Sequence, residues 1–584
     1  MRKSTWKKAV SLLLASTMVV GSAAAVTGCG GSKDNKTITL DVLSQAANYS
    51  GLQTGWMGDV LKKKFNVKLN IIRDQQGMLK TRMEEGNLGD IVIFAHNDAD
   101  YQNAVKTGLL YDWEEDDLVK DYAPNVAKNM KDAMEKNRSI TKTATNNKES
   151  KVYGIGNDIA LSNEDHLSFF YTWDVRWDLY KQLGYPKVKT LDDLKNLMIE
   201  MKKICPQDDN GNPTYAVSLW PDWDVDYVMY VKATATAWYG YDELGIGLYD
   251  PSTGTYHDAM EENGPYLEML KFFNELYQEK LVDPDSMTQT YDKAVEKVQN
   301  GGVFWSIFNY SGQLAYNKPV HTKAGKMMYC MKPEDATPIV YGMNTQGGDY
   351  VTSIGATSEY PEKCMEIINW FASPEGKMTY SYGPKGVCWD YDKEGNTYFT
   401  DLGKECKKNV NTKMGNGYKG SFKDGQCQAA ISTWAIDVEN PDSNGETYNS
   451  DNWKSNITKA ETEIEQDWRD KTGCNTSNEY FEKSGKYMVS PGTSFALEQK
   501  DDDLKTTWSQ VTGEIKAGSW KAMFSKNDKE FEKNVSEMIK KVKNYGYDKC
   551  LNWSKKQAEK RYQLEKEATK NSKKKEATKN SNKK

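Results

Sequence analysis

Histidine and the familiar catalytic motifs are scarce in this chain of 584 residues. The four histidines (His96, His166, His257 and His321) are far apart, and no HExxH sequence occurs. A Walker A loop, a GxSxG sequence and a Rossmann glycine fingerprint are also missing. These absences argue against zinc-protease, P-loop, serine-hydrolase and dinucleotide chemistry. Pairs of Asp and Glu are too numerous to exclude a glycosidase by counting, so a polysaccharide-acting enzyme stays an alternative.

The cysteines lack the close spacing of a zinc site. Nine are present, no CxxC pair occurs, and the intervals between them are long and irregular, so zinc is disfavoured. Setting aside Cys29 leaves an even number, which permits disulfides in an exported protein, although the pairing cannot be read from the spacing. Cys364 lies in a stretch with helical periodicity, which indicates a buried free thiol.

Long hydrophobic runs are limited to the first thirty residues. Basic residues at positions 2, 3, 7 and 8 precede an apolar run over 9–20, which is too short to span a bilayer. Small residues and Val26-Thr27-Gly28-Cys29 follow, and this sequence resembles a bacterial lipobox. We therefore expect removal of residues 1–28, lipidation of Cys29 and a flexible tether over 29–36. An ordinary secretory signal with a coincidental cysteine is the alternative.

Charge is segregated along the chain. Without the basic start and residues 551–584, which carry twelve basic and four acidic side chains, the body has a net charge near -18. A body this acidic argues against nucleic acid as a partner. The Lys-rich end, residues 553–584, repeats the sequence KEATKNS at 566–572 and 575–581. We interpret it as a solvated or frayed helical tail, with contact to anionic wall polymer or lipid as the alternative.

The length and the order of elements predict an α/β protein with two lobes. More than five hundred residues follow the tether, which exceeds what one core usually organises. Strands expected over 37–43, 67–72 and 90–94 alternate with helices expected over 51–64 and 78–85, so a parallel sheet should form. Ligands bind beyond the carboxyl ends of such strands. The candidates there are Gln45, Asn48, His96, Asn97 and Asp98.

The second part of the chain continues the α/β pattern. A strand is expected over 168–173, and Thr190 is suited to cap a helix that runs to about residue 205. A turn over 208–213 should then precede a strand over 215–219.

Aromatic residues are plentiful, with 17 Trp and 35 Tyr. Several follow strand ends or alternate with polar residues, where a ligand could reach them, although core packing is the alternative for each. Sugar rings present apolar C–H faces that stack on indoles and hydroxyls that bond to carboxylates and amides. The candidates for a carbohydrate site are Trp220, Trp223, Trp305, Asn309 and Tyr310; Trp389, Trp434 and Trp453 also lie in polar stretches.

One acidic segment approximates the spacing of a calcium loop. Asp390, Asp392, Glu394 and Asp401 would be its ligands, but Asp401 replaces the usual final Glu and a strand-like segment replaces the expected helix. We interpret this segment as a hairpin turn with solvated acids, and the calcium loop stays the alternative.

The order of several short motifs resembles the family 1 extracellular solute-binding proteins of bacterial ABC importers, in their large lipoprotein form. Together the motifs span nearly the whole mature chain. They are Leu88-Gly89-Asp90-Ile91-Val92 with 104–112, Tyr153-Gly154-Ile155-Gly156-Asn157, 170–174 with 189–194, Leu281-Val282-Asp283-Pro284-Asp285 with 300–305, 360–364 with 373–377 and 383–387, and, near the end, 518–520 and 546–548.

The resemblance implies two α/β lobes, joined by hinge crossings, that close over a solute in a cleft. We expect crossings near 158–166 and 348–357, with Asn157, Asp349 and Tyr350 beside them. Lobe 1 would comprise 37–163 and 350–385, and lobe 2 would comprise 164–349 and 386–552.

The function expected from these features is capture of a carbohydrate, with an oligosaccharide as the foremost ligand class, for an ABC importer. The protein would be a non-catalytic monomer without a cofactor, anchored by lipid on the outer face of the cell membrane and docking on permease subunits. Besides the enzyme, an anchored glycan adhesin is the alternative. Trp305→Ala and Trp223→Ala are both expected to weaken binding while leaving the stability of the free protein unchanged.

Overall fold

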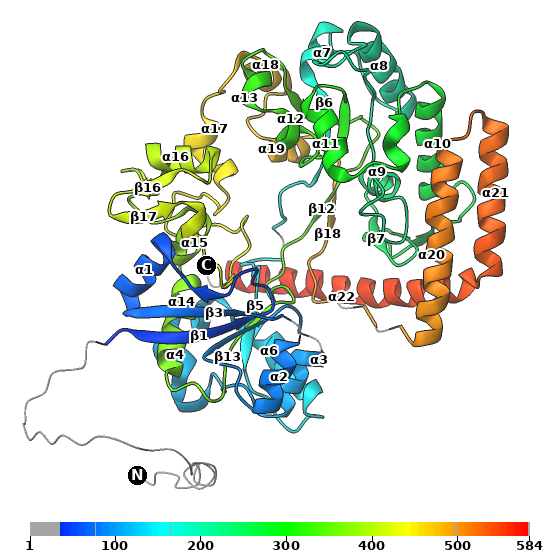
Figure 1. Cartoon of the computed structure of the whole chain (residues 1–584). Coiled ribbons are helices and arrows are strands. Elements are labelled where there is room, and N and C mark those ends of the chain that lie inside the picture. Colours follow the sequence, from blue (N-terminus) through cyan, green and yellow to red (C-terminus); the bar gives the residue numbers. More distant parts are fainter. Residues whose placement is uncertain are drawn as a thin grey trace, which may run out of the picture.

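The computed structural model describes residues 36–581 except Gln76, Asp98, Glu164, Ala496 and Gln499, with side chains up to residue 569. The signal segment, Cys29 and most of the tether lie outside the described residues, and so does Asp98. Two separate hydrophobic cores define two lobes, which stand apart on either side of the strands β12 (Ile339–Tyr341) and β18 (Met488–Ser490) (Figure 1). Within the described residues, no helix has the length and apolar character needed to cross a membrane.

Lobe 1 contains the predicted parallel sheet. The strands β1 (Ile38–Ser44), β3 (Val67–Arg73) and β4 (Ile91–Phe94) are parallel, in the sheet order β2-β3-β1-β4-β13-β5. The antiparallel strands β2 (Gly51–Leu52), β13 (Val351–Ile354) and β5 (Gly154–Gly156) complete it. Its helices are α1 (Gly55–Phe65), α2 (Met78–Glu85), α3 (Ala99–Lys106), α4 (Leu118–Tyr122), α5 (Pro124–Asn129), α6 (Lys131–Ala144), α14 (Pro361–Phe371) and α15 (Pro374–Tyr382).

Residues 386–453 also pack in lobe 1, which corrects the predicted boundary at 386. They form β14 (Trp389–Tyr391), β15 (Thr397–Phe399), α16 (Asp401–Lys408), β16 (Lys413–Gly415) and β17 (Tyr418–Ser421). Their apolar side chains share one core with β1 and α1. Trp56 of α1, for example, stacks on Phe422 at 5.6 Å and donates from Nε1 to its carbonyl at 2.8 Å.

Lobe 2 is built on the antiparallel sheet β10-β6-β11, formed by Trp305–Phe308, Tyr171–Arg176 and Met328–Cys330. Thr190 caps α8 as expected, in a capping box with Asp193. The predicted strand over 215–219 forms only isolated bridges. The other elements are α7 (Trp177–Gln182), α8 (Leu191–Ile204), α9 (Met229–Tyr239), β7 (Asp242–Leu244), β8 (Gly247–Tyr249), β9 (Tyr256–Asp258), α10 (Pro265–Gln278), α11 (Tyr291–Gln299), α12 (Gln313–Tyr316), α13 (Pro319–Thr322), α18 (Glu463–Thr472), α19 (Ser477–Lys483), α20 (Asp502–Met523) and α21 (Asp528–Asn544).

In the described part of the chain, three segments pass between the lobes. Core membership changes from lobe 1 to lobe 2 between Ala160 and Phe169, near the predicted first crossing. The second change falls between Val340 and Met343, earlier than the predicted 348–357, because β13 lies inside the sheet of lobe 1. The chain returns to lobe 2 between Trp453 and Ile464, through α17 (Lys454–Ile457).

The C-terminal segment is not a solvated tail throughout. Helix α22 (Tyr547–Ser581) extends well into the Lys-rich stretch. Ser554, Gln557, Ala558 and Glu565 are fully or almost fully buried at helical spacing, and α22 packs on α20, β7 and β9. The sequence prediction for 553–584 is therefore corrected for residues up to 565, because residues at helical spacing between the lysines form a buried stripe.

Candidate functional site

The predicted residues of lobe 1 gather at one edge of its sheet. The carboxyl ends of β1 and β4 meet there, together with the start of β13 and the end of β5. Gln45 Oε1 accepts from the Ala95 amide at 3.1 Å, and Asn97 Nδ2 donates to Asp349 Oδ1 at 3.3 Å. The Tyr350 amide donates to Asn157 Oδ1 at 3.2 Å, while Asn48 and His96 are exposed on the neighbouring loops. The topology thus joins side chains from four distant segments into a polar edge.

Two lysines lie near this polar edge with their pKa values lowered by burial. Lys136 donates from Nζ to the carbonyls of Gly347 and Gly348 at 3.0 and 2.8 Å, and its pKa is lowered. Lys377 of α15 donates to the Trp434 carbonyl. Burial lowers the pKa of Lys377 to about 8, although the nearby negative charge of Asp158 raises it. Burial in turn raises the pKa of Asp158.

Lobe 2 contributes an aromatic surface, formed by Phe170, Trp223, Tyr291 and Tyr310. Trp223 stacks on Tyr291 with ring centroids 4.3 Å apart, and Tyr310 lies 5.8 Å from Trp223 and 5.5 Å from Phe170. Trp223 and Phe170 are nevertheless 43% and 41% exposed. Large ring faces that pack side by side and still reach solvent suit a ligand with flat apolar faces.

Carboxylates hold the loop that carries Trp223. Asp222 accepts from the Tyr291 amide, at the first residue of α11, at 3.0 Å. Asp224 accepts from the Met229 amide at 2.8 Å and from Trp520 Nε1 at 2.7 Å, and burial raises its pKa to about 6. The indole of Trp223 is therefore positioned between two anchored ends.

Two of the aromatic residues predicted for the carbohydrate site are not available to a ligand, and Trp389, Trp434 and Trp453 are buried as well. Trp305 is 0% exposed and lies in the core of lobe 2, stacked on Trp173 at 5.8 Å and on Phe273 at 6.1 Å. Strand β10 is buried on both faces, so the polar residue Ser306 beside Trp305 is also buried. Trp220 is 3% exposed and supports Trp223 edge-on at 5.7 Å. Asn309 is half-buried beside Tyr310, and its backbone amide donates to the Phe170 carbonyl at 3.4 Å.

The calcium-like segment folds as a hairpin. Strands β14 and β15 are antiparallel, and Asp392 in their turn accepts from the amides of Glu394 and Asn396 at 2.9 and 2.8 Å. Asp390 lies on β14, and Asp401 begins α16. Among the described residues, no group of three or more His, Cys, Asp or Glu side chains is arranged to hold a metal ion.

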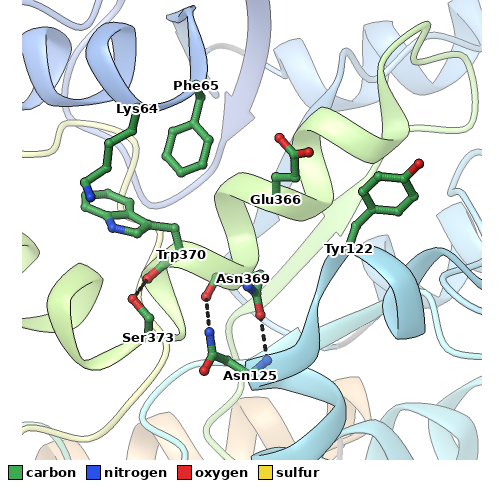
Figure 2. A pocket seen from close by; sticks show the side chains of 8 residues that line it. All are labelled: Lys64, Phe65, Tyr122, Asn125, Glu366, Asn369, Trp370 and Ser373. Atoms are coloured by element: carbon green, nitrogen blue, oxygen red, sulfur yellow. Dashed lines mark hydrogen bonds between the residues drawn. The ribbon is translucent and has the colours of Figure 1, made fainter. Parts of the chain in front are cut away.

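A separate hollow of about 380 Å³ lies between α1, α5 and α14 (Figure 2). Its polar groups largely pair with one another. The Asn125 amide donates to Asn369 Oδ1 at 2.8 Å, and Lys64 lies 5.9 Å above the Trp370 ring and 2.8 Å from Glu375. Its described lining includes none of the predicted ligand residues.

Solved structures share this architecture. An HMO-binding, ABC-transporter-associated solute-binding protein from Bifidobacterium longum infantis matches with a TM-score of 0.57 at 12% identity, covering 91% of this chain and 100% of the other. The ABC-transporter substrate-binding protein FusA of Streptococcus pneumoniae, as an EF-hand mutant with fructo-nystose, matches at 0.51 and 14% identity over 89% and 99%. The alginate-binding protein AlgQ2 without calcium matches at 0.51 and 16% identity over 90% and 99%. No protein-family model and no curated protein matches the chain.

The chain therefore has the two-lobed fold of extracellular solute-binding proteins of ABC transporters, which confirms the fold class expected from the sequence.

Several residues beside these surfaces escaped the sequence analysis. Tyr291 follows a helix cap and Phe170 precedes a strand, and neither position carries a local signal of exposure. Lys377 and Asp158 meet only through the fold, since more than two hundred residues separate them.

Proposed function

We propose that this protein captures a carbohydrate, and an oligosaccharide in particular, for an ABC importer. The observation that carries the proposal is the aromatic surface of lobe 2, whose rings remain open to solvent on a fold shared with sugar-binding solute-binding proteins. Sugar rings would stack on Trp223 and its neighbours, and several adjoining rings suit a ligand longer than one sugar.

The polar edge of lobe 1 would supply the opposite face. Gln45, Asn48, His96, Asn97, Asn157, Asp349 and Tyr350 offer amide, imidazole, carboxylate and hydroxyl groups to sugar hydroxyls. Asn309 and Tyr310 would do the same from lobe 2, and Asp98 belongs to the same proposal. Closure about the hinge would then bury the ligand, and the ligand favours the closed form through contacts made on both sides.

The anchor is part of the same proposal. Cys29 would carry a diacylglyceryl group, whose two chains hold the protein on the outer face of the membrane beside the permease subunits. The protein acts as a monomer, without a cofactor and without catalysis. Replacement of Cys29 by Ser is expected to release the protein into the medium or to leave its signal uncleaved. Processing insensitive to globomycin, together with detergent-free solubility of the wild type, would contradict the anchor.

A glycan array followed by calorimetry tests the ligand class. The expected result is binding of a set of related oligosaccharides, with negative heat-capacity change from ring burial. Clear peptide binding without glycan binding would overturn the carbohydrate assignment and leave the receptor role standing. Hydrolysis of a bound glycan by the purified protein would instead support the enzyme alternative.

A further inference from the structure

A buried carboxylate in lobe 2 receives side-chain groups from three other segments of the chain. Asp242 of β7 is 3% exposed, and it accepts from Tyr341 Oη at 3.2 Å and from Ser490 Oγ at 3.0 Å. The guanidinium of Arg561, on α22, is ion-paired with the same carboxylate and donates to Ser490 Oγ at 3.0 Å. A carboxylate so thoroughly removed from water requires a counter-charge, and Arg561 supplies it.

Arg561 is itself held firmly. Its Nε donates to Glu565 Oε1 at 2.9 Å, and the guanidinium lies 5.6 Å from the centre of the Tyr249 ring. Tyr249 Oη donates to Glu565 at 2.6 Å. The helix therefore presents the guanidinium in one orientation, in which it bridges two buried acids.

The two hydroxyls that reach Asp242 come from two neighbouring strands, of which β12 leads into the second crossing. Tyr341 ends β12 (Ile339–Tyr341) and Ser490 ends β18 (Met488–Ser490), and these strands pair in parallel. The Gly342 amide donates to the Ser490 carbonyl at 2.8 Å, and the Leu167 amide of the first crossing donates to the Tyr341 carbonyl at 2.8 Å. Both strands lie between the lobes in Figure 1, with α22 running past them. Asp242 thus holds the second crossing where it leaves lobe 2, and Leu167 bonds the first crossing to the same place.

We infer that Arg561, acting through Asp242, is a positioning residue for the hinge, so that the C-terminal helix sets how the two lobes are held before ligand arrives. With Arg561 in place, Asp242 is ion-paired and bonded to both strands. Without it, the carboxylate loses its counter-charge and the strands lose a common attachment. The effect on ligand affinity rests on the proposed function, whereas the effect on the hinge does not.

The test is the distribution of inter-lobe distances in the full chain without ligand. Spin labels on non-canonical amino acids at the exposed positions Lys63 of α1 and Lys203 of α8 report this distance by electron double resonance. Arg561→Met is expected to broaden the distribution at least twofold, and Arg561→Lys to restore most of its sharpness. Lys560→Met is the matched control, because Lys560 lies on the same helix but pairs with Glu498.

A second variant separates positioning from stability. Asp242→Asn with Arg561→Met removes the charges of this pair, so it should recover part of the melting temperature lost by Arg561→Met while the distribution stays broad; the recovery is partial because the buried Glu565 still lacks its cation. An unchanged distribution in Arg561→Met, or in the double variant if the single one does not fold, would overturn the inference. A glycan identified by the array should bind Arg561→Met about fivefold more weakly, because more conformations are lost on closure. If no glycan binds at all, the proposed function fails and the distance measurement still decides the role of Arg561.

Discussion

The polar edge of lobe 1 and the aromatic surface of lobe 2 differ in what their side chains contact before a ligand binds. In lobe 1, Asn97, Asn157 and Gln45 are already bonded to protein partners. A ligand there exchanges one hydrogen bond for another, with a small net gain. In lobe 2, ring faces stand in water and gain free energy when covered. We infer that lobe 2 supplies most of the affinity, while lobe 1 selects among hydroxyl arrangements.

The largest effect is expected where an indole belongs to the core of lobe 2 and not to its aromatic surface. Trp305→Ala removes a side chain that is stacked on Trp173 and Phe273, so the free energy of unfolding should fall by about 3–5 kcal/mol. Urea denaturation of the free protein measures it. If Trp305→Ala instead left the free energy of unfolding unchanged and abolished ligand binding, Trp305 would belong to the ligand site.

The next effect concerns Lys377, beside the polar edge. Its pKa, about 8 when folded, lies below the value of 10.5 for a solvated lysine, so the unfolded chain binds more protons between these pH values. Stability of the wild type relative to Lys377→Met should therefore rise from pH 8 to pH 10.5, by ~3 kcal/mol. A flat difference across this window would show that the ammonium is not desolvated.

The third prediction tests, through Trp223, how much the aromatic surface of lobe 2 contributes to binding. Trp223→Ala should weaken oligosaccharide binding at least tenfold, or about 1.4 kcal/mol, because it removes the largest and most exposed ring of the aromatic surface. The free energy of unfolding should change by less than about 0.5 kcal/mol. Tyr398→Ala is the matched control, since Tyr398 is a similarly exposed aromatic on β15 of lobe 1. Equal losses in both variants would deny any special role to the aromatic surface.

Local pattern was sufficient for the elements of the lobe 1 sheet. The strands expected over 37–43, 67–72 and 90–94 correspond to β1, β3 and β4, with ends shifted by one residue. Because these strands were expected to run parallel, their carboxyl ends had to lie at the same edge of the sheet, and this placed Gln45 and Asn97 there. Helix α1 begins four residues later than expected, since Gly51 and Leu52 pair with β3 instead.

Properties that depend on packing could not be predicted in this way. Trp305 and Trp223 each have a polar neighbour in the sequence, Ser306 and Asp222, yet one lies in a strand covered on both faces and the other on an anchored loop. Residues 386–453 carry no local mark of lobe 1, because their assignment comes from contacts such as Trp56 with Phe422. The buried stripe of α22 could likewise not be predicted, because lysines separate its residues in the sequence.

The smallest effect tests the polar edge itself. Asn97→Ala removes the amide that donates to Asp349 at 3.3 Å, and Asp349 is exposed enough to be solvated without it. Stability should therefore change little, and affinity for the glycan should fall only about threefold to fivefold, since one hydrogen bond contributes about 1 kcal/mol. Calorimetry against a panel of epimers measures this, with the exposed Asn411→Ala of lobe 1 as control. We expect the loss to differ between epimers, because a group that selects hydroxyl arrangements acts on some and not on others. A uniform loss above tenfold would place the main binding energy in lobe 1 and reverse the comparison.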